Sequence, residues 1–315
     1  MKALILPLGL GLAFLLAWLE PEWGRTLKQA GLIPWLVMLI FMVNGYQVRL
    51  AEIPRELSFL KGLVATTVIS LLLGPWLALY SAELLALPAG ALLGLVVMGT
   101  VPSTLSSCIV QTQLAGGYAV WALLFSMALN IAGVFSMPLM LTLVLQESAQ
   151  FQVDPWPLLR QLGLMVLLPF LVGVTLQQRL PFSPDARPLQ YLPSICIVVG
   201  VWLALSDSAS LFHHLDPLLL LKIGLAALVL HLLLFVGNWW TGRLLRIDRP
   251  GCIAMALSGS QKTLPVAISV LALLDGSVGE ALLVCVLFHF LILFADALIA
   301  PRLSATPVRA ASSGA

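Results

Sequence analysis

The chain is a succession of apolar runs of roughly 20 residues, separated by short polar or proline-containing connections. Runs of this length cross hydrocarbon as helices, and they lack the weaker alternating pattern of about ten residues that membrane β-strands show. Charged residues make up 10% of the sequence and hydrophobic residues 60%, whereas a soluble domain carries about 25% charged residues. The sequence predicts an all-α polytopic membrane protein.

The apolar runs predict ten transmembrane helices that form two halves. The first half is residues 1–146, a loop over 147–155 joins it to the second half over 156–301, and residues 302–315 form a small, polar tail that we expect to be disordered. The predicted spans cover residues 3–19, 31–48, 58–80, 89–114, 118–145, 156–178, 190–212, 217–243, 251–274 and 278–300.

The basic residues indicate the orientation. Cytoplasmic loops of membrane proteins carry an excess of Lys and Arg. With ten spans both termini share one side, and that side carries eleven of the 16 basic residues: Lys2, Arg49, Arg55, Lys61, Arg179, Arg187, Arg243, Arg246, Arg249, Arg302 and Arg309. We therefore expect a multi-pass protein of the plasma (inner) membrane with both termini in the cytoplasm. The net charge of +2 is too small to indicate binding of nucleic acid.

Two polar stretches interrupt the predicted fourth and ninth spans, at residues 101–108 and 257–265. Each contains hydroxyl groups together with Pro or Gly, which break a helix, and broken helices at membrane depth are tolerated where they line a cavity. Because each half has five spans, the second half enters the membrane from the opposite face. The spacing therefore predicts an inverted repeat, whose interrupted helices hold a binding site near the middle of the bilayer.

The candidate binding residues are the polar side chains near these two breaks. Hydroxyl, amide and backbone oxygens suit a monovalent cation or a polar substrate, although Ser and Thr in membrane helices also bond to their own helix or join neighbouring helices. The candidates are Ser103, Thr104, Ser106, Ser107, Cys108, Gln111, Thr112, Ser126, Asn130, Ser258, Ser260, Gln261, Lys262 and Thr263.

Lys262 is a charged residue in the middle of an apolar span. An ionisable side chain at this depth is costly, and it is a functional-site hypothesis by default. It could attract an anionic substrate, act as a protonatable coupling group or take the place of a bound cation. The alternative is that its chain extends to the membrane surface.

Other polar residues within spans either line the cavity or pair between helices: Asn44, Gln47, His231, Asn238, His289 and Asp296. His289 and Asp296 share one helix face and could form a proton relay, but we expect Asp296 to lie near the cytoplasmic end and to be hydrated. The four Cys residues have no metal-ligand spacing, so no cofactor is indicated other than a sodium ion.

The stretches Val101–Cys108, Leu114–Gly117 and Ser258–Pro265 resemble the bile acid:sodium symporter superfamily, most closely its SBF-like branch, which includes the P7 type of solute carrier. The resemblance implies a panel domain (spans 1, 2, 6 and 7), a core domain (spans 3–5 and 8–10) and crossing, unwound spans 4 and 9. It also implies sodium ligands at Ser107, Ser126 and Gln261. A glutamate that joins both sodium sites in the bile-acid branch is Leu257 here, and an asparagine is Lys262.

The sequence thus predicts a secondary active transporter of a small organic anion, coupled to sodium or protons and working by alternating access in the lipid membrane. Two other classes stay open: an intramembrane enzyme and a regulator that keeps the fold without transporting. The enzyme is disfavoured because no protease, zinc or diphosphate-binding motif is present.

Overall fold

Helices account for all the regular structure that the computed structural model describes, over residues 2–48, 54–147, 154–180, 183, 186–207, 216–274 and 278–304. The helices are α1 (Lys2–Leu19), α2 (Pro21–Gln29), α3 (Leu32–Tyr46), α4 (Leu57–Thr67), α5 (Gly74–Leu84), α6 (Ala89–Thr100), α7 (Ser106–Leu114), α8 (Ala119–Glu147), α9 (Pro155–Leu162), α10 (Leu168–Arg179), α11 (Arg187–Asp207), α12 (Pro217–Leu244), α13 (Arg249–Ser260), α14 (Leu264–Leu271) and α15 (Gly279–Ser304). Two π-helical turns, η2 (Val68–Leu73) and η3 (Gly163–Leu167), join α4 to α5 and α9 to α10. The all-helical prediction is confirmed.

Five helical stretches within the described ranges are long and apolar enough to cross a membrane. They are Leu57–Leu84, Ala119–Glu147, Pro155–Arg179, Pro217–Leu244 and Gly279–Ser304, and the pair α2–α3, bent by 77°, makes a sixth if it counts as one span. Ten continuous spans are not found by this criterion. The predicted fourth and ninth spans are each divided into two shorter helices, the predicted seventh contains only the shorter apolar helix Tyr191–Ser206, and the predicted first is not among the spans found. A multi-pass membrane protein is nevertheless confirmed.

Three details differ from the sequence-based expectation. Residues 21–29 form the helix α2, since Pro21 suits the first turn and Glu22 and Lys28 complement the two ends of the helix dipole. At the other end of the chain, α15 continues to Ser304, past the predicted end of the tenth span. The rest of the predicted disordered tail and most of the predicted connecting loop lie outside the described residues.

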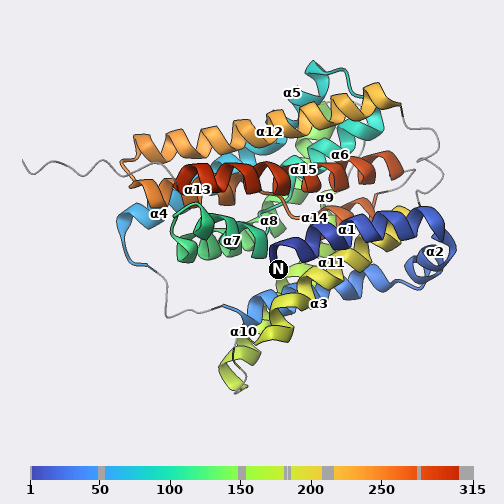
Figure 1. Ribbon diagram of the computed structural model, residues 1–315, viewed down its shortest axis with the longest axis horizontal. Coiled ribbons are helices and arrows are strands. Elements are labelled where there is room, and N and C mark those ends of the chain that lie inside the picture. Colours follow the sequence, from blue (N-terminus) through green and yellow to red (C-terminus); the bar gives the residue numbers. More distant parts are fainter. Residues whose placement is uncertain are drawn as a thin grey trace, which may run out of the picture.

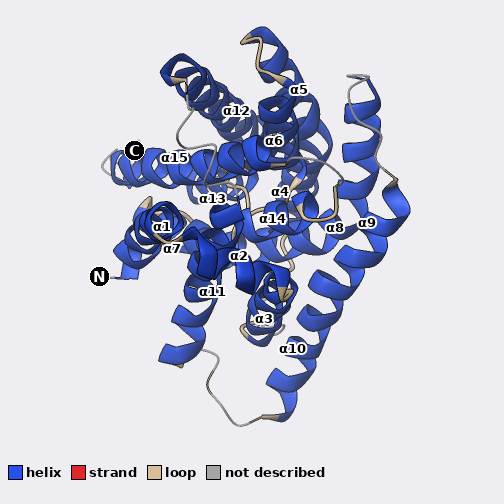
Figure 2. Cartoon of the chain, turned by 90° about the vertical axis from the view of Figure 1, so that its right-hand side faces the viewer, coloured by secondary structure: helices blue, strands red, loops and turns tan. Residues whose placement is uncertain are grey.

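The helices form two groups that lie side by side (Figure 1). In one group, which we call the panel, α3 packs on α10 and α11, and α11 packs on α1 and α2. In the other, which we call the core, α15 packs on α6 and α12, α12 on α13, and α7 on α8. The helix α14 lies between the two groups (Figure 2), where it packs on α15 and α6 of the core and on α11 and α3 of the panel.

Glycines allow the closest approach within the panel. A Cβ atom on Gly45 of α3 would lie 2.0 Å from the carbonyl oxygen of Phe170, and one on Gly173 of α10 would lie 2.0 Å from that of Met42. Both distances are far below van der Waals contact, so the backbones of α3 and α10 touch at two places where one of the two residues is a glycine. Small residues at helix contacts are a general device of membrane proteins.

We expect Gly173→Ala to force α3 and α10 apart and to destabilise the protein by about 1–3 kcal/mol, the usual cost of overpacking. Thermal unfolding of the purified protein in detergent measures this. The matched control is Gly163→Ala in the same long helical stretch, where an added Cβ would meet nothing within 4 Å. Equal melting temperatures for the two variants would contradict the close contact.

Candidate functional site

The two predicted breaks are present and lie against each other. The helix α6 ends at Thr100 and α7 begins at Ser106, while α13 ends at Ser260 and α14 begins at Leu264. The backbone amide of Thr263 donates a hydrogen bond to the carbonyl oxygen of Pro102 at 2.9 Å. Two segments some 160 residues apart in the sequence are thereby joined at the centre of the core.

A local backbone preference explains where α6 stops. Val101 precedes Pro102 and is extended (φ −66°, ψ 149°), because a residue before proline is disfavoured in the helical region. Gln261 is extended in the same way (φ −73°, ψ 143°). Pro265 stands in the first turn of α14, where its missing N–H group costs no helical hydrogen bond.

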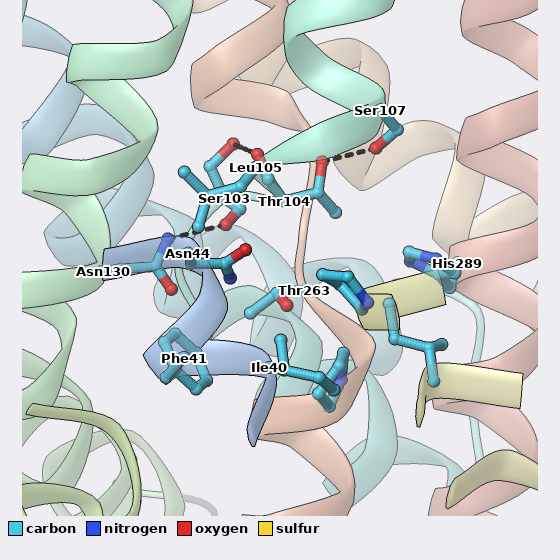
Figure 3. A pocket seen from close by; sticks show the side chains of 13 residues that line it. Ile40, Phe41, Asn44, Ser103, Thr104, Leu105, Ser107, Asn130, Thr263 and His289 are labelled. Atoms are coloured by element: carbon cyan, nitrogen blue, oxygen red, sulfur yellow. Dashed lines mark hydrogen bonds between the residues drawn. The ribbon is translucent and has the colours of Figure 1, made fainter. Parts of the chain in front are cut away.

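A pocket opens beside the crossing, between the panel and the core (Figure 3). Together with the solvent at its mouth it encloses about 450 Å³ of empty space. Its polar lining comes mainly from the breaks and from α8 and α15, whereas α3 and α11 of the panel contribute mostly apolar side chains. The lining residues are Ile40, Phe41, Asn44, Ser103, Thr104, Leu105, Ser107, Asn130, Pro193, Ile197, Thr263, Pro265 and His289.

Gln261 connects the two breaks through its side chain. Its Oε1 atom accepts hydrogen bonds from Thr104 Oγ1 at 2.6 Å and from Ser107 Oγ at 2.9 Å. Its Nε2 atom donates to Gln111 Oε1 at 3.0 Å and to Asp296 Oδ2 at 2.8 Å. Gln261 is fully buried, so both ends of its amide are satisfied by neighbours from three other elements.

A second cluster joins the first break to α8. Asn130 Nδ2 donates to the carbonyl oxygens of Ser103 at 2.9 Å and of Ser126 at 2.7 Å, and Ser126 Oγ donates to Ser103 Oγ at 3.3 Å. The Oδ1 atom of Asn130 and the Nε2 atom of His289 are buried without a hydrogen-bond partner. Both residues line the pocket, so a ligand could satisfy these atoms.

The remaining candidates lie behind the pocket rather than in it. Cys108 Sγ contacts Ser258 Oγ at 3.2 Å, and Thr112 and Ser260 are fully buried with unpartnered hydroxyl oxygens. None of these four residues is part of the pocket lining. The side chain of Ser106 lies outside the described part of the structure.

Lys262 points away from the pocket, into a cage of oxygen atoms. It is fully buried, so it does not extend to the membrane surface. Its Nζ atom donates to the carbonyl oxygen of Ser70 at 2.8 Å, to Ser70 Oγ at 3.0 Å, and to the carbonyl oxygens of Gly99 at 3.0 Å and Val101 at 3.1 Å. These contacts include no carboxylate, so oxygen dipoles alone surround the ammonium group.

The cage arises from carbonyl groups that the helices leave free. In the π-helical turn η2, the amide of Gly74 bonds to the carbonyl of Ile69, five residues back. The next donor in that series would be the nitrogen of Pro75, which carries no hydrogen, so the carbonyl of Ser70 lacks a helical donor. Gly99 and Val101 lie at the end of α6, where carbonyl groups have no partner within the helix.

The sequence led us to expect a hydrated Asp296, and this expectation is wrong. Its side chain is fully buried and pairs with that of His231, with Oδ1 and Nε2 2.9 Å apart. His289, the predicted relay partner, instead contacts the carbonyl oxygen of Lys262 through Nδ1 at 3.1 Å. The pairing joins α12 to α15, which spacing within one helix could not reveal.

The part of the pocket that the sequence analysis did not find comes from the panel. Asn44 and His289 were recognisable as polar residues within apolar spans, but Ile40, Phe41 and Ile197 have no signal that separates them from lipid-facing or core residues. Only the packing of the panel on the core brings them to the crossing.

Comparison with known proteins bears on what such a crossing does. A family model described as the SBF-like CPA transporter family matches residues 5–305. The chain belongs to this family. The predicted relationship is therefore confirmed, and the chain is a member of a transporter family, not an enzyme.

Curated relatives carry names of the same kind. One from Oryza sativa subsp. indica, named "Probable sodium/metabolite cotransporter BASS4, chloroplastic", is 27% identical over 93% of this chain and 74% of its own length. Its Arabidopsis thaliana counterpart is 29% identical over 64% of this chain and 50% of its own length. These names are consistent with sodium as a coupling ion.

We expect Lys262→Ala to destabilise the protein, because each buried carbonyl that loses its donor costs about 1–3 kcal/mol. The variant also leaves a space lined by oxygen atoms, so added sodium or ethylammonium ions should restore part of the lost stability. Thermal unfolding in detergent, with and without these ions, measures both effects.

Lys61→Ala, which removes an exposed lysine, is the matched control and should change little. A Lys262→Ala variant as stable as the unmodified protein in the absence of both ions would contradict the role of the cage.

Proposed function

We propose that the protein is a secondary active transporter of a small organic anion and that the pocket at the crossing is its binding site. The observation that carries the proposal is the position of two helix N-termini. The short helices α7 and α14 both begin at the pocket, since Leu105, Ser107, Thr263 and Pro265 belong to its lining. The residues before the two helices, Leu105 and Thr263, make no side-chain capping bond.

Uncapped N-termini favour an anion for two reasons. The first backbone N–H groups of a helix have no partner within it, and the helix dipole places partial positive charge at this end. A carboxylate in the pocket would satisfy these groups. The buried ammonium group of Lys262 adds positive charge to the same region without contacting the pocket.

The rest of the lining indicates an amphipathic substrate. Ile40, Phe41 and Ile197 form an apolar wall on the panel side, while Asn130 and His289 present unpartnered polar atoms on the core side. We therefore expect an anion with an apolar part and with a hydroxyl or N–H group that donates to Asn130 Oδ1. Substrates of this kind fit a pocket with one polar and one apolar wall.

Alternating access follows from the position of the pocket between the panel and the core. Movement of the core against the panel would open the pocket first to one side of the membrane and then to the other. We propose the full ten-span inverted repeat for this motion, in the plasma (inner) membrane with both termini in the cytoplasm. The distribution of basic residues supports this orientation.

Coupling to sodium or protons provides the energy. The names of the relatives favour sodium, with Ser107, Ser126 and Gln261 as the residues that would hold the ion. The ammonium group of Lys262 already occupies an oxygen cage of the kind that a monovalent cation would occupy. In that cage the ammonium group of Lys262 takes the place of a bound monovalent cation. The second candidate function, a non-transporting regulator, would keep the fold but show no flux.

Transport is tested with purified protein in liposomes. Exchange of labelled lactate, pyruvate and benzoate is measured, with lactamide and benzamide as uncharged analogues. We expect saturable exchange of at least one carboxylate and none of its amide. Liposomes that show no exchange of any carboxylate, despite folded protein, would favour the regulator.

Thr263→Val keeps the shape of the side chain and removes one hydroxyl from the pocket. A hydrogen bond is worth about 1 kcal/mol, so we expect KM to rise roughly fivefold for a substrate that uses it. The matched control is Thr67→Val, whose hydroxyl bonds within its own helix to the carbonyl of Leu63 at 2.8 Å and lies outside the pocket. An equal effect of both substitutions would place the site elsewhere.

A further inference from the structure

The pair formed by His231 and Asp296 is the buried acid–base pair of the core. Both side chains are fully buried, and Nε2 lies 2.9 Å from Oδ1. A buried pair of ionisable groups is expensive in a membrane protein and usually serves the movement of ions or protons. Neither residue lines the pocket, so direct contact with a substrate does not explain the pair.

The hydrogen bonds of the pair fix how many protons it holds. His231 Nδ1 faces the carbonyl oxygen of Ser260 at 3.4 Å. A carbonyl only accepts, so this contact requires a proton on Nδ1. The contact between Nε2 and Oδ1 then requires one more proton, either on the nitrogen of an imidazolium or on the oxygen of a neutral acid. With this proton the pair is neutral, and without it the pair carries one negative charge.

The surroundings of Asp296 suit a proton better than a metal ion. Its Oδ1 atom faces His231, and its Oδ2 atom accepts a hydrogen bond from Gln261 Nε2 at 2.8 Å. A sodium ion requires several converging oxygen ligands, as hard cations generally do, but here both carboxylate oxygens face nitrogen atoms. Within the described residues, no group of three or more His, Cys, Asp or Glu side chains could hold a metal.

Gln261 links the pair to the pocket. The same amide that donates to Asp296 accepts from Thr104 and Ser107, and both of these residues line the pocket. The path from the carboxylate to the pocket therefore crosses a single side chain. A change of charge at Asp296 acts on the orientation of this amide and, through it, on the two hydroxyl groups that meet a substrate.

Few other ionisable groups are close to the pair. Cys108 is the titratable residue of α7, and α6 and α14 carry none. His289 and Lys262 contact one another through the Lys262 carbonyl, and the Lys262 ammonium lies in its own oxygen cage. On α12, Lys222 and Arg243 are about 13 and 18 Å from His231 along the helix.

The remaining titratable residues on the helices that pack against α12 and α15 are exposed, lie toward helix ends or contact other groups, except for Cys196, which is buried in the middle of α11. Those on α4, α5 and α13 are Lys61, Tyr80, Glu83, Arg249 and Cys252, those on α15 are Glu280, Cys285 and Arg302, and the others on α11 are Arg187, Tyr191 and Asp207.

We propose that the His231–Asp296 pair is a proton-binding site coupled to the pocket, so that a proton binds together with the organic anion and crosses the membrane with it. This inference rests on the proposed transport function. With the pair protonated, the buried core carries the single positive charge of Lys262, which favours the anion. With the proton lost, the negative charge of the pair cancels that of Lys262 and the anion binds less tightly.

The test uses the full chain in liposomes without a sodium gradient. For a carboxylate that the unmodified protein exchanges, an acidic exterior should drive accumulation, and a dye sealed inside should report acidification of the lumen. Asp296→Asn removes the titratable group and keeps an oxygen and a donor at the same place. This variant should retain anion exchange and lose both proton-driven accumulation and lumen acidification.

Glu83→Gln, which neutralises an exposed acid on α5, is the matched control and should behave as the unmodified protein. His231→Gln is the second variant if Asp296→Asn does not fold, and the same pattern is expected of it. In detergent without substrate, thermal stability from about pH 5 to 8 should depend on pH in the unmodified protein and less in either variant.

Two results would overturn the proposal. One is lumen acidification by Asp296→Asn equal to that of the unmodified protein. The other is loss of exchange along with driven accumulation in both folded variants, which would assign the pair a structural role. If the unmodified protein exchanges no carboxylate, the transport function is contradicted instead. The proton site would still be identified in that case if thermal stability depends on pH in the unmodified protein and this dependence is lost in both variants.

Discussion

The hydrogen bonds of the interrupted backbone are the constraint on which the centre of this structure depends. A backbone polar group in hydrocarbon has no water to bond with, so each break must find its partners inside the protein. Each of the two breaks supplies hydrogen-bond partners to the other. Thr263 donates to Pro102 across the crossing, Lys262 supplies donors to the end of α6, and Asn130 satisfies Ser103 from α8. Neither break would be stable without the other.

Lys262 has a structural role within this constraint. A lysine buried without an acid is costly, and here the cost is offset by three carbonyl groups that would otherwise lack donors. The π-helical turn before Pro75 supplies one of them, so a local irregularity in one helix and a charge on another are parts of one arrangement. Lys262, for which the sequence left open attraction of an anion, proton coupling or replacement of a cation, thus holds the breaks together next to the pocket.

Much of the fold and part of the site could be predicted from the sequence. The apolar runs predicted the helices, and the clusters at 101–108 and 257–265 predicted the breaks, because Pro and Gly act on their own backbone. Thr104, Ser107 and Thr263, which the sequence named as candidates, line one pocket, since polar groups in lipid must face the interior. The partners of Asp296 and Lys262 were not predictable, because they lie on other helices and depend on how those helices are rotated.

The sequence by itself determined that this chain lies in a membrane, that its elements are helices and where two of them break, because these properties depend on hydrophobicity and local backbone preference. Only the tertiary structure decided which groups meet. In the tertiary structure Lys262 points away from the pocket, His231 pairs with Asp296, and the apolar side chains of the panel lie against the crossing. The physical reason is that hydrogen bonds and packing act over a few ångströms between helices, and residue order does not encode their relative rotation directly.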